Sequence, residues 1–108
     1  MAEVTREIIQ DVVFSPQLVG KVQSRRITIP PGAVTGPHTH NGPVFGAVLS
    51  GTAFVQVDGG ELIVVRPGEA FFEPAEVRID RFDGGDAELV FLAWFPLPNG
   101  VDPELRLL

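Results

Sequence analysis

The sequence has no cysteine and no tyrosine, and only two of its 108 residues are histidine. Without cysteine, a disulfide framework, a thiolate nucleophile and a thiolate metal ligand are all excluded. Basic residues are also few, since 8 Lys and Arg stand against 14 Asp and Glu and leave a formal net charge of −6. Because this charge repels a phosphate backbone, we expect no nucleic-acid partner.

Long apolar runs are missing as well. No stretch approaches the ~20 apolar residues of a membrane span. The first residues include acids where a signal peptide has a basic start and an apolar run. We therefore expect no membrane partner and a cytoplasmic protein, which the lack of cysteine also fits. The length suits a single domain over residues 1–108.

Twelve glycines and ten prolines divide the chain into short apolar runs, which predicts strands joined by turns and almost no helix. Asp58-Gly59-Gly60 predicts a hairpin between the runs that flank it. Residues 89–95 are apolar on both faces, and a second subunit is one candidate to cover the outer face. The expected strands are 6–14, 21–29, 36–38, 44–50, 52–57, 61–65, 70–73, 77–82 and 88–95, with an irregular tail over 96–108.

The two histidines, His38 and His40, lie two positions apart. On an extended strand such residues point to the same face, so both imidazoles can converge on one point. A converging pair is half of a site for a first-row metal ion. The alternative is the edge of a loop that carries two histidines without a role.

The histidines belong to a longer pattern with two parts. It reads Gly32-x5-His38-x-His40-x3-Val44-x6-Gly51 and then Gly68-x5-Pro74-x-Glu76-x2-Ile79-x3-Asp83. These segments, 32–51 and 68–83, resemble the two motifs of the cupin superfamily, and the short stretch between them resembles its smallest members. The resemblance implies an all-β fold, a double-stranded β-helix or jelly-roll barrel of the cupin type, formed by one domain.

The resemblance also implies where a metal would sit, and there the chain departs from the pattern. Metal-binding cupins surround the ion with two His and a Glu from the first motif and a His from the second. Here the Glu position is Val44 and the second-motif His position is Ile79, so His38 and His40 remain as the metal ligands. Two imidazoles alone hold Zn, Fe, Mn or Ni weakly, so the sequence leaves two alternatives open, a divalent metal at His38 and His40 or no cofactor.

Four other polar residues are candidates near this pair. Glu76 and Asp83 could bend towards the histidines, whereas Glu73 is expected to be solvated. Arg81 shares strand parity with Ile79 if the segment is regular, which would place an anion-binding guanidinium in the barrel. The alternative is a bulge before Phe82 that turns Arg81 to solvent, and Arg78 and Asp80 are expected to form an exposed pair.

Two functions are compatible with these residues, and whether the protein is an enzyme stays open. The first is binding of a small molecule of unknown identity in the barrel. The second is a metal-dependent cupin enzyme, of dioxygenase or isomerase type, that uses the two histidines plus a non-standard ligand. A structural subunit without a working pocket is a third reading, and the lack of tyrosine disfavours the sugar-nucleotide epimerase chemistry of some cupins. The expected lining of the pocket is His38, His40, Val44, Ile79 and Arg81.

The apolar residues of the chain exceed what one small barrel can bury. The surplus lies in segment 8–14 and in the two-sided strand over 89–95. Since cupins commonly pair through such strands, the sequence predicts a homodimer.

Overall fold

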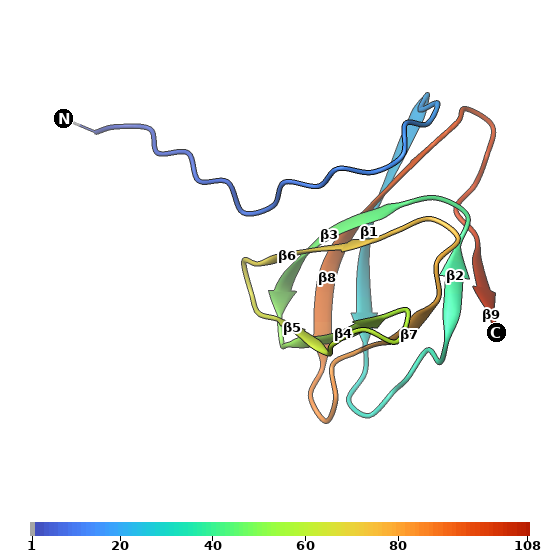
Figure 1. Ribbon diagram of the computed structural model, residues 1–108. Helices are drawn as coiled ribbons and strands as arrows, with labels where there is room; N and C mark the ends of the chain where they lie inside the picture. The colour runs from blue at the N-terminus through green and yellow to red at the C-terminus, as the bar shows by residue number, and fades with distance from the viewer. Residues whose placement is uncertain (1) are drawn as a thin grey trace.

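The computed structural model describes residues 2–108, and the regular structure in this range is entirely β. It has no helix long and apolar enough to cross a membrane, within the same residues. Figure 1 shows the strands gathered into one body, from which the N-terminal residues extend. The strands are β1 (Lys21–Ile29), β2 (His38–His40), β3 (Val44–Ser50), β4 (Ala53–Val57), β5 (Ile63–Val65), β6 (Ala70–Glu73), β7 (Ile79–Asp83), β8 (Leu89–Leu97) and β9 (Leu105–Leu107).

The strands form two sheets in which neighbours are antiparallel. One sheet has the order β1-β8-β3-β6 and the other the order β5-β4-β7-β2-β9. This arrangement confirms the jelly-roll fold, with one difference from the expected barrel. The sheets share no strand among the described residues, so they form a sandwich that is open where β1 faces β9 and where β6 faces β5.

The core lies between the two sheets and follows strand parity. On β8 the buried residues alternate with half-buried ones, so Phe91 and Phe95 point inward whereas Trp94 points outward. Phe91 packs with Phe71 and Phe82, with ring centroids 4.9–5.6 Å apart. β8 is therefore packed on one face and only partly covered on the other, as its two-sided apolar sequence predicts.

Glycines at two places explain local features of the sheets, a tight turn and a close contact between strands. The hairpin between β4 and β5 turns at Asp58 and Gly59, with φ angles of 47° and 70°, which confirms the expected turn. In β3, the position of Gly46 has no room for a side chain because the ring of Phe71 lies against its backbone. This close approach holds Phe71 in the space between the sheets.

Two expectations for the chain ends are wrong. Residues 6–14 form no strand; they belong to an extended segment, residues 2–19, which within the described residues pairs with no other strand (Figure 1). Conversely, the tail that was expected to be irregular contains β9, which pairs with β2. Both errors have one cause, since a strand needs hydrogen bonds from a neighbour that its own sequence does not specify.

Candidate metal-binding site

β2 carries both histidines into the space between the sheets. The strand lies between β7 and β9, where His38 is opposite Ile79 and Leu107. The exposed fraction is 2% for His38, and the side chain of His40 is 12% exposed. Their ring centroids are 4.9 Å apart and the rings are nearly perpendicular. The i, i+2 spacing therefore places the two imidazoles together, as the sequence predicts.

A carboxylate from the other sheet completes the group. Glu73 is the last residue of β6 and stands directly before Pro74. It shares strand parity with buried Phe71, points into the sandwich and is only 3% exposed, so the expectation of a solvated side chain is wrong. In the sheet, Glu73 is opposite Val44. The carboxylate absent at position 44 is thus supplied by the neighbouring strand.

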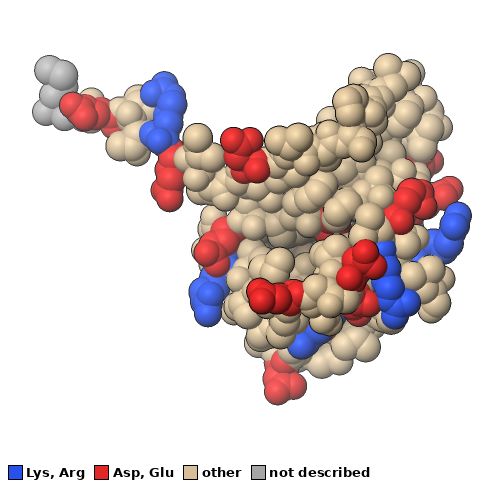
Figure 2. Space-filling model, viewed as in Figure 1, with Lys and Arg blue, Asp and Glu red and all other residues tan. Residues whose placement is uncertain are grey.

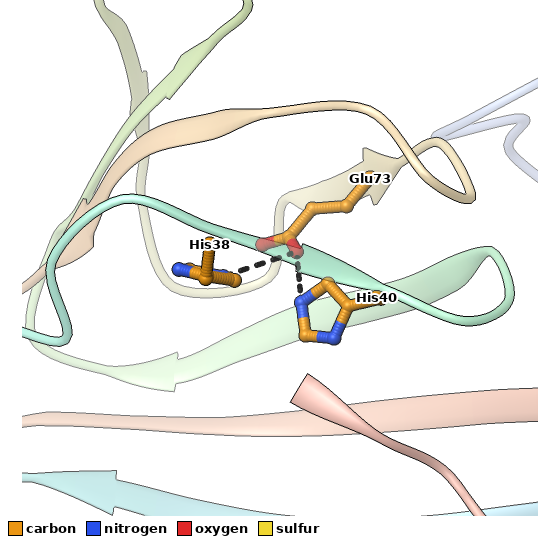
Figure 3. A group of neighbouring side chains, drawn as sticks. All are labelled: His38, His40 and Glu73. Carbon is orange, nitrogen blue, oxygen red and sulfur yellow. Dashed lines mark ion pairs between the residues drawn. The ribbon is translucent and has the colours of Figure 1, made fainter. Parts of the chain in front are cut away.

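The three side chains converge on a small space, which Figure 3 shows. Glu73 Oε2 lies 2.7 Å from His40 Nε2 and 4.0 Å from His38 Nε2. One ligand atom from each residue lies within 4.8 Å of the others. Three atoms that can each donate a lone pair therefore surround one position, which is what coordination of a metal ion requires.

Glu73 Oε2 is a buried oxygen without a hydrogen-bond partner, even though its distance to His40 would permit one. A buried carboxylate oxygen that is left unpaired is costly, and in native proteins it calls for a specific explanation. A cation at the centre of the group supplies that explanation. The donor set thus fits a divalent metal ion.

The backbone fixes which nitrogen of His38 faces the carboxylate. His38 Nδ1 lies 2.8 Å from the carbonyl oxygen of Gly36. Because a carbonyl only accepts, Nδ1 carries the hydrogen and donates it, so in the neutral ring Nε2 presents its lone pair towards Glu73. Metal-binding histidines characteristically have such a second partner, which orients the ring and fixes the tautomer. A lone pair that faces a carboxylate also favours a cation between them.

The cluster lies in a cavity of about 130 Å³ between the two sheets. Taking ~30 Å³ per water molecule in the liquid, this is room for about four water-sized groups. The walls are mostly aliphatic and aromatic. The lining residues are Ile27, Ile29, Thr35, His38, His40, Val44, Phe71, Glu73, Phe82, Phe91, Ala93, Phe95 and Leu105.

Of the five residues expected to line the pocket, some line the cavity and others lie elsewhere. His38, His40 and Val44 line the cavity. Ile79 is fully buried in the hydrophobic core and does not line it. Arg81 lies outside, among the residues of a surface cleft on the other side of β7. Three of the five therefore reach the cavity.

A bulge explains the position of Arg81. Gln56 pairs with Arg81 and Val57 with Ile79, so one extra residue, Asp80, shifts the parity of β7. This is the outward alternative that the sequence left open. The guanidinium stacks on the ring of Phe54, 4.9 Å from its centroid.

On this outer side of β7, Asp83 forms an ion pair with Arg81. Its carboxylate accepts two hydrogen bonds from the guanidinium, at 2.8 and 3.0 Å, and one from the backbone N–H of Gly85. The hydrogen bonds from Arg81 hold the pKa of Asp83 below its ordinary value. Asp83 is therefore engaged away from the histidines and is not the missing ligand.

The remaining acidic and basic candidates also lie away from the cluster. Glu76 is exposed in a turn with a φ of 58°. Arg78 and Asp80 form the expected exposed pair, with 2.6 Å between Nε and Oδ1. Hydrogen bonds from the Gly59 N–H, and then from Arg78, lower the pKa of Asp80. Of the candidate carboxylates in the two motifs, Glu73 alone joins the histidines.

Sequence reasoning could have found Glu73 from two signals. Parity places it on the same face as Phe71, two residues earlier in a short apolar run. It also stands next to Pro74 of the second motif, beside the strand that carries Val44. Neither signal tells which face of β6 is inward, and only the pairing with β3 decides that.

Comparison with known proteins agrees with this fold. A family model described as "Cupin domain" matches residues 25–95. No curated protein matches the chain. Among solved structures, an oxalate oxidase is 26% identical, with a TM-score of 0.66, over 81% of this chain and 46% of its own.

Two further solved structures are similar in fold. A DMSP lyase, DddQ from Ruegeria pomeroyi DSS-3, is 18% identical with a TM-score of 0.67, over 77% of this chain and 42% of its own. A cupin-like protein from Thermotoga maritima is 24% identical with a TM-score of 0.66, over 77% of this chain and 62% of its own. The chain thus spans less than half the length of the two enzymes.

Proposed function

The chain belongs to the cupin family, whose model covers residues 25–95, and we propose that it binds a divalent metal ion through His38, His40 and Glu73. One observation carries the proposal: the buried Oε2 of Glu73 has no hydrogen-bond partner, yet it lies 2.7 and 4.0 Å from the two Nε2 atoms. Two imidazole nitrogens and one carboxylate oxygen suit Zn, Mn, Fe or Ni. This set replaces the family's four ligands with three, one of them at a new position.

The residues of the chain prepare the site in different ways. The Gly36 carbonyl holds the His38 ring in one tautomer, and Glu73 contributes a negative charge that compensates the ion. Three protein ligands leave coordination positions open, so a bound metal would act as a Lewis acid towards a small molecule. The apolar walls exclude bulk water from the cavity and shape the space that this molecule can fill.

We propose that the cavity binds a small molecule next to the ion. The likeness to an oxalate oxidase supports an enzyme, and the three candidate ligands would make it a metal-dependent one. A binding protein is the second candidate, because in the described residues no further titratable side chain lines the cavity to transfer a proton. Both candidates require the same three ligands.

A metal-free alternative makes a distinct prediction. If a proton rather than a metal ion compensates Glu73, protonated His40 and the carboxylate form a buried ion pair at 2.7 Å. Such a site would bind its ligand without metal and would be indifferent to chelators. A measurement of metal affinity therefore distinguishes the metal site from the metal-free alternative.

Titration calorimetry of chelator-treated protein with Zn²⁺ and Mn²⁺ tests the proposal. Wild type should bind about one ion per chain, and Glu73→Gln, which keeps the shape but weakens the ligand, should bind at least about 100-fold more weakly. Glu76→Gln is the matched control, because it removes an exposed carboxylate of the same motif. Equal affinity of Glu73→Gln and wild type, or no binding by wild type, would contradict the proposal.

A further inference from the structure

The charges around the cavity are few and of one sign. Glu73 is the only charged side chain that lines it within residues 2–108, and neither Lys nor Arg does. The guanidinium of Arg81 is on the outer side of β7, held by Asp83. The guanidinium of Arg25 lies 4.9 Å from the ring centroid of Phe95, which lines the cavity, but Arg25 is exposed and is not itself a lining residue.

The charges around the cavity determine which ligand charge it can accept. With a divalent ion, one carboxylate and two neutral imidazoles, the centre has a formal charge of +1. One anionic donor on the ligand neutralises that charge. A second carboxylate would lie among side chains such as Ile27, Phe71 and Phe91 without a counter-charge, and burial of an unpaired charge is strongly unfavourable.

We infer that the cavity takes a small molecule with a single metal-binding group and an apolar remainder, and that it rejects an acid such as succinate, whose second carboxylate would lie against the apolar walls. This inference rests on the proposed metal site. The volume of about 130 Å³ limits the ligand to the size of a short-chain acid or alcohol. Butyrate and succinate are a suitable pair of probes, because they differ only where a terminal methyl group is replaced by a second carboxylate.

Cobalt(II) provides a readout that needs no knowledge of the reaction. Its visible absorption changes when a ligand enters the coordination shell, so the Co²⁺-loaded protein can be titrated with each acid. We expect saturable binding of butyrate and at least tenfold weaker binding of succinate. Equal or tighter binding of succinate, or no spectral response to butyrate, would overturn the inference.

A pair of lysine variants tests the stated cause. Ile27→Lys places a cation on the cavity wall and should raise the affinity for succinate relative to butyrate. Thr28→Lys adds the same charge to the same strand at an exposed position, and it should leave the affinities for succinate and butyrate unchanged. If Ile27→Lys leaves the preference unchanged, the missing counter-charge is not its cause. Failure of Co²⁺ to bind overturns the metal site itself, whereas a wrong acid preference in loaded protein overturns this inference alone.

A second inference comes from a different part of the molecule, residues 2–19, here called the N-terminal arm. The arm is extended and apolar, yet Val4, Ile8, Val13 and Leu18 are 75%, 82%, 96% and 79% exposed. Exposed apolar side chains in such a row mark an interaction surface. The sequence of the arm over 6–14 is that of a strand, yet within residues 2–108 it pairs with no other strand.

The path of the arm shows which surface it belongs to. Phe14 packs on Phe45 and Phe72, at centroid distances of 5.4 and 6.0 Å, on the outer face of the four-stranded sheet. Trp94 and Leu92 of β8 point to the same outer face and are only half buried. In Figure 2 the upper part of the body, next to the arm, shows few charged side chains, which gather lower on the visible face.

We propose that this face and the arm bind a second copy of the chain in a two-fold dimer. Each copy has both an unpartnered arm and a partly covered sheet face, so a symmetric pair satisfies both at once. At ~3.3 Å per residue the arm spans about 60 Å, enough to cross a neighbouring body. A standard interface has about 20–30 residues per side, and the arm, residues 2–19, would supply a large share of them.

Light scattering and tryptophan fluorescence test the dimer. Wild type should have twice the chain mass of 11.6 kDa at micromolar concentration. Val13→Asp should give a monomer, with the emission of Trp94, the only tryptophan, shifted to longer wavelength. Val34→Asp makes the same change at another exposed valine, outside the arm, and should leave the dimer intact. A monomeric wild type, or a Val13→Asp variant that stays dimeric, would overturn the proposal.

Discussion

Replacing Glu73 by glutamine should have opposite effects on stability with and without metal. In metal-free protein the buried Oε2 has no hydrogen-bond partner, and an unsatisfied buried group costs about 1–3 kcal/mol, more when charged. Glu73→Gln removes the charge and keeps the shape, so the free energy of unfolding should rise by about 1 kcal/mol or more. For a domain of this length, that is a Tm increase of roughly 4–8 °C.

With metal present the order should reverse. A ligand at 100 times its Kd stabilises the native state by about 2.7 kcal/mol, and wild type should gain this while the variant gains little. Scanning calorimetry in chelator and then in excess Zn²⁺ measures both effects, and Glu76→Gln serves as the control that should change neither. The outcome that refutes this reasoning is a metal-free Glu73→Gln protein that is less stable by about 3–5 kcal/mol, because breaking a buried ion pair has that cost. Glu73 would then be paired with protonated His40, and a metal would not be needed.

Three further predictions concern the surroundings of the site. Val44→Glu should lower the stability of metal-free protein by about 2–4 kcal/mol, since it buries a second carboxylate beside the first; thermal unfolding in chelator checks this. Gly46→Ala should cost about 1–3 kcal/mol in urea unfolding, because the new methyl group overlaps the ring of Phe71. Arg81→Gln should leave metal affinity unchanged but reduce stability above the ordinary carboxyl pKa of ~3.9. The lowered pKa of Asp83 means that this stabilisation is present above that pH and is lost as pH falls through the folded-state value, so unfolding measured from pH 2 to 6 should show a smaller acid dependence in the variant.

The sequence by itself determined the features that depend on nearby residues. Turn residues delimited most strands, and β1, β3 and β6 have the expected bounds. The Asp58-Gly59 turn required only the backbone freedom of its own residues. The convergence of His38 and His40 required only the two-residue period of a strand. The two spaced motifs were sufficient to identify the family, because their residues lie at fixed distances along the chain.

The tertiary structure alone decided the features that depend on a distant partner. Glu73 became the third candidate ligand because β6 pairs with β3 in a register that turns it inward opposite Val44. Arg81 lies outside the cavity because β7 has a bulge where it pairs with β4, and the bulge turns the Arg81 side chain to the outer side. β9 is a strand because it pairs with β2, whereas the arm pairs with no strand within the described residues. Each outcome depends on hydrogen bonds between segments far apart in sequence, and the energy of those bonds is not contained in either segment taken alone.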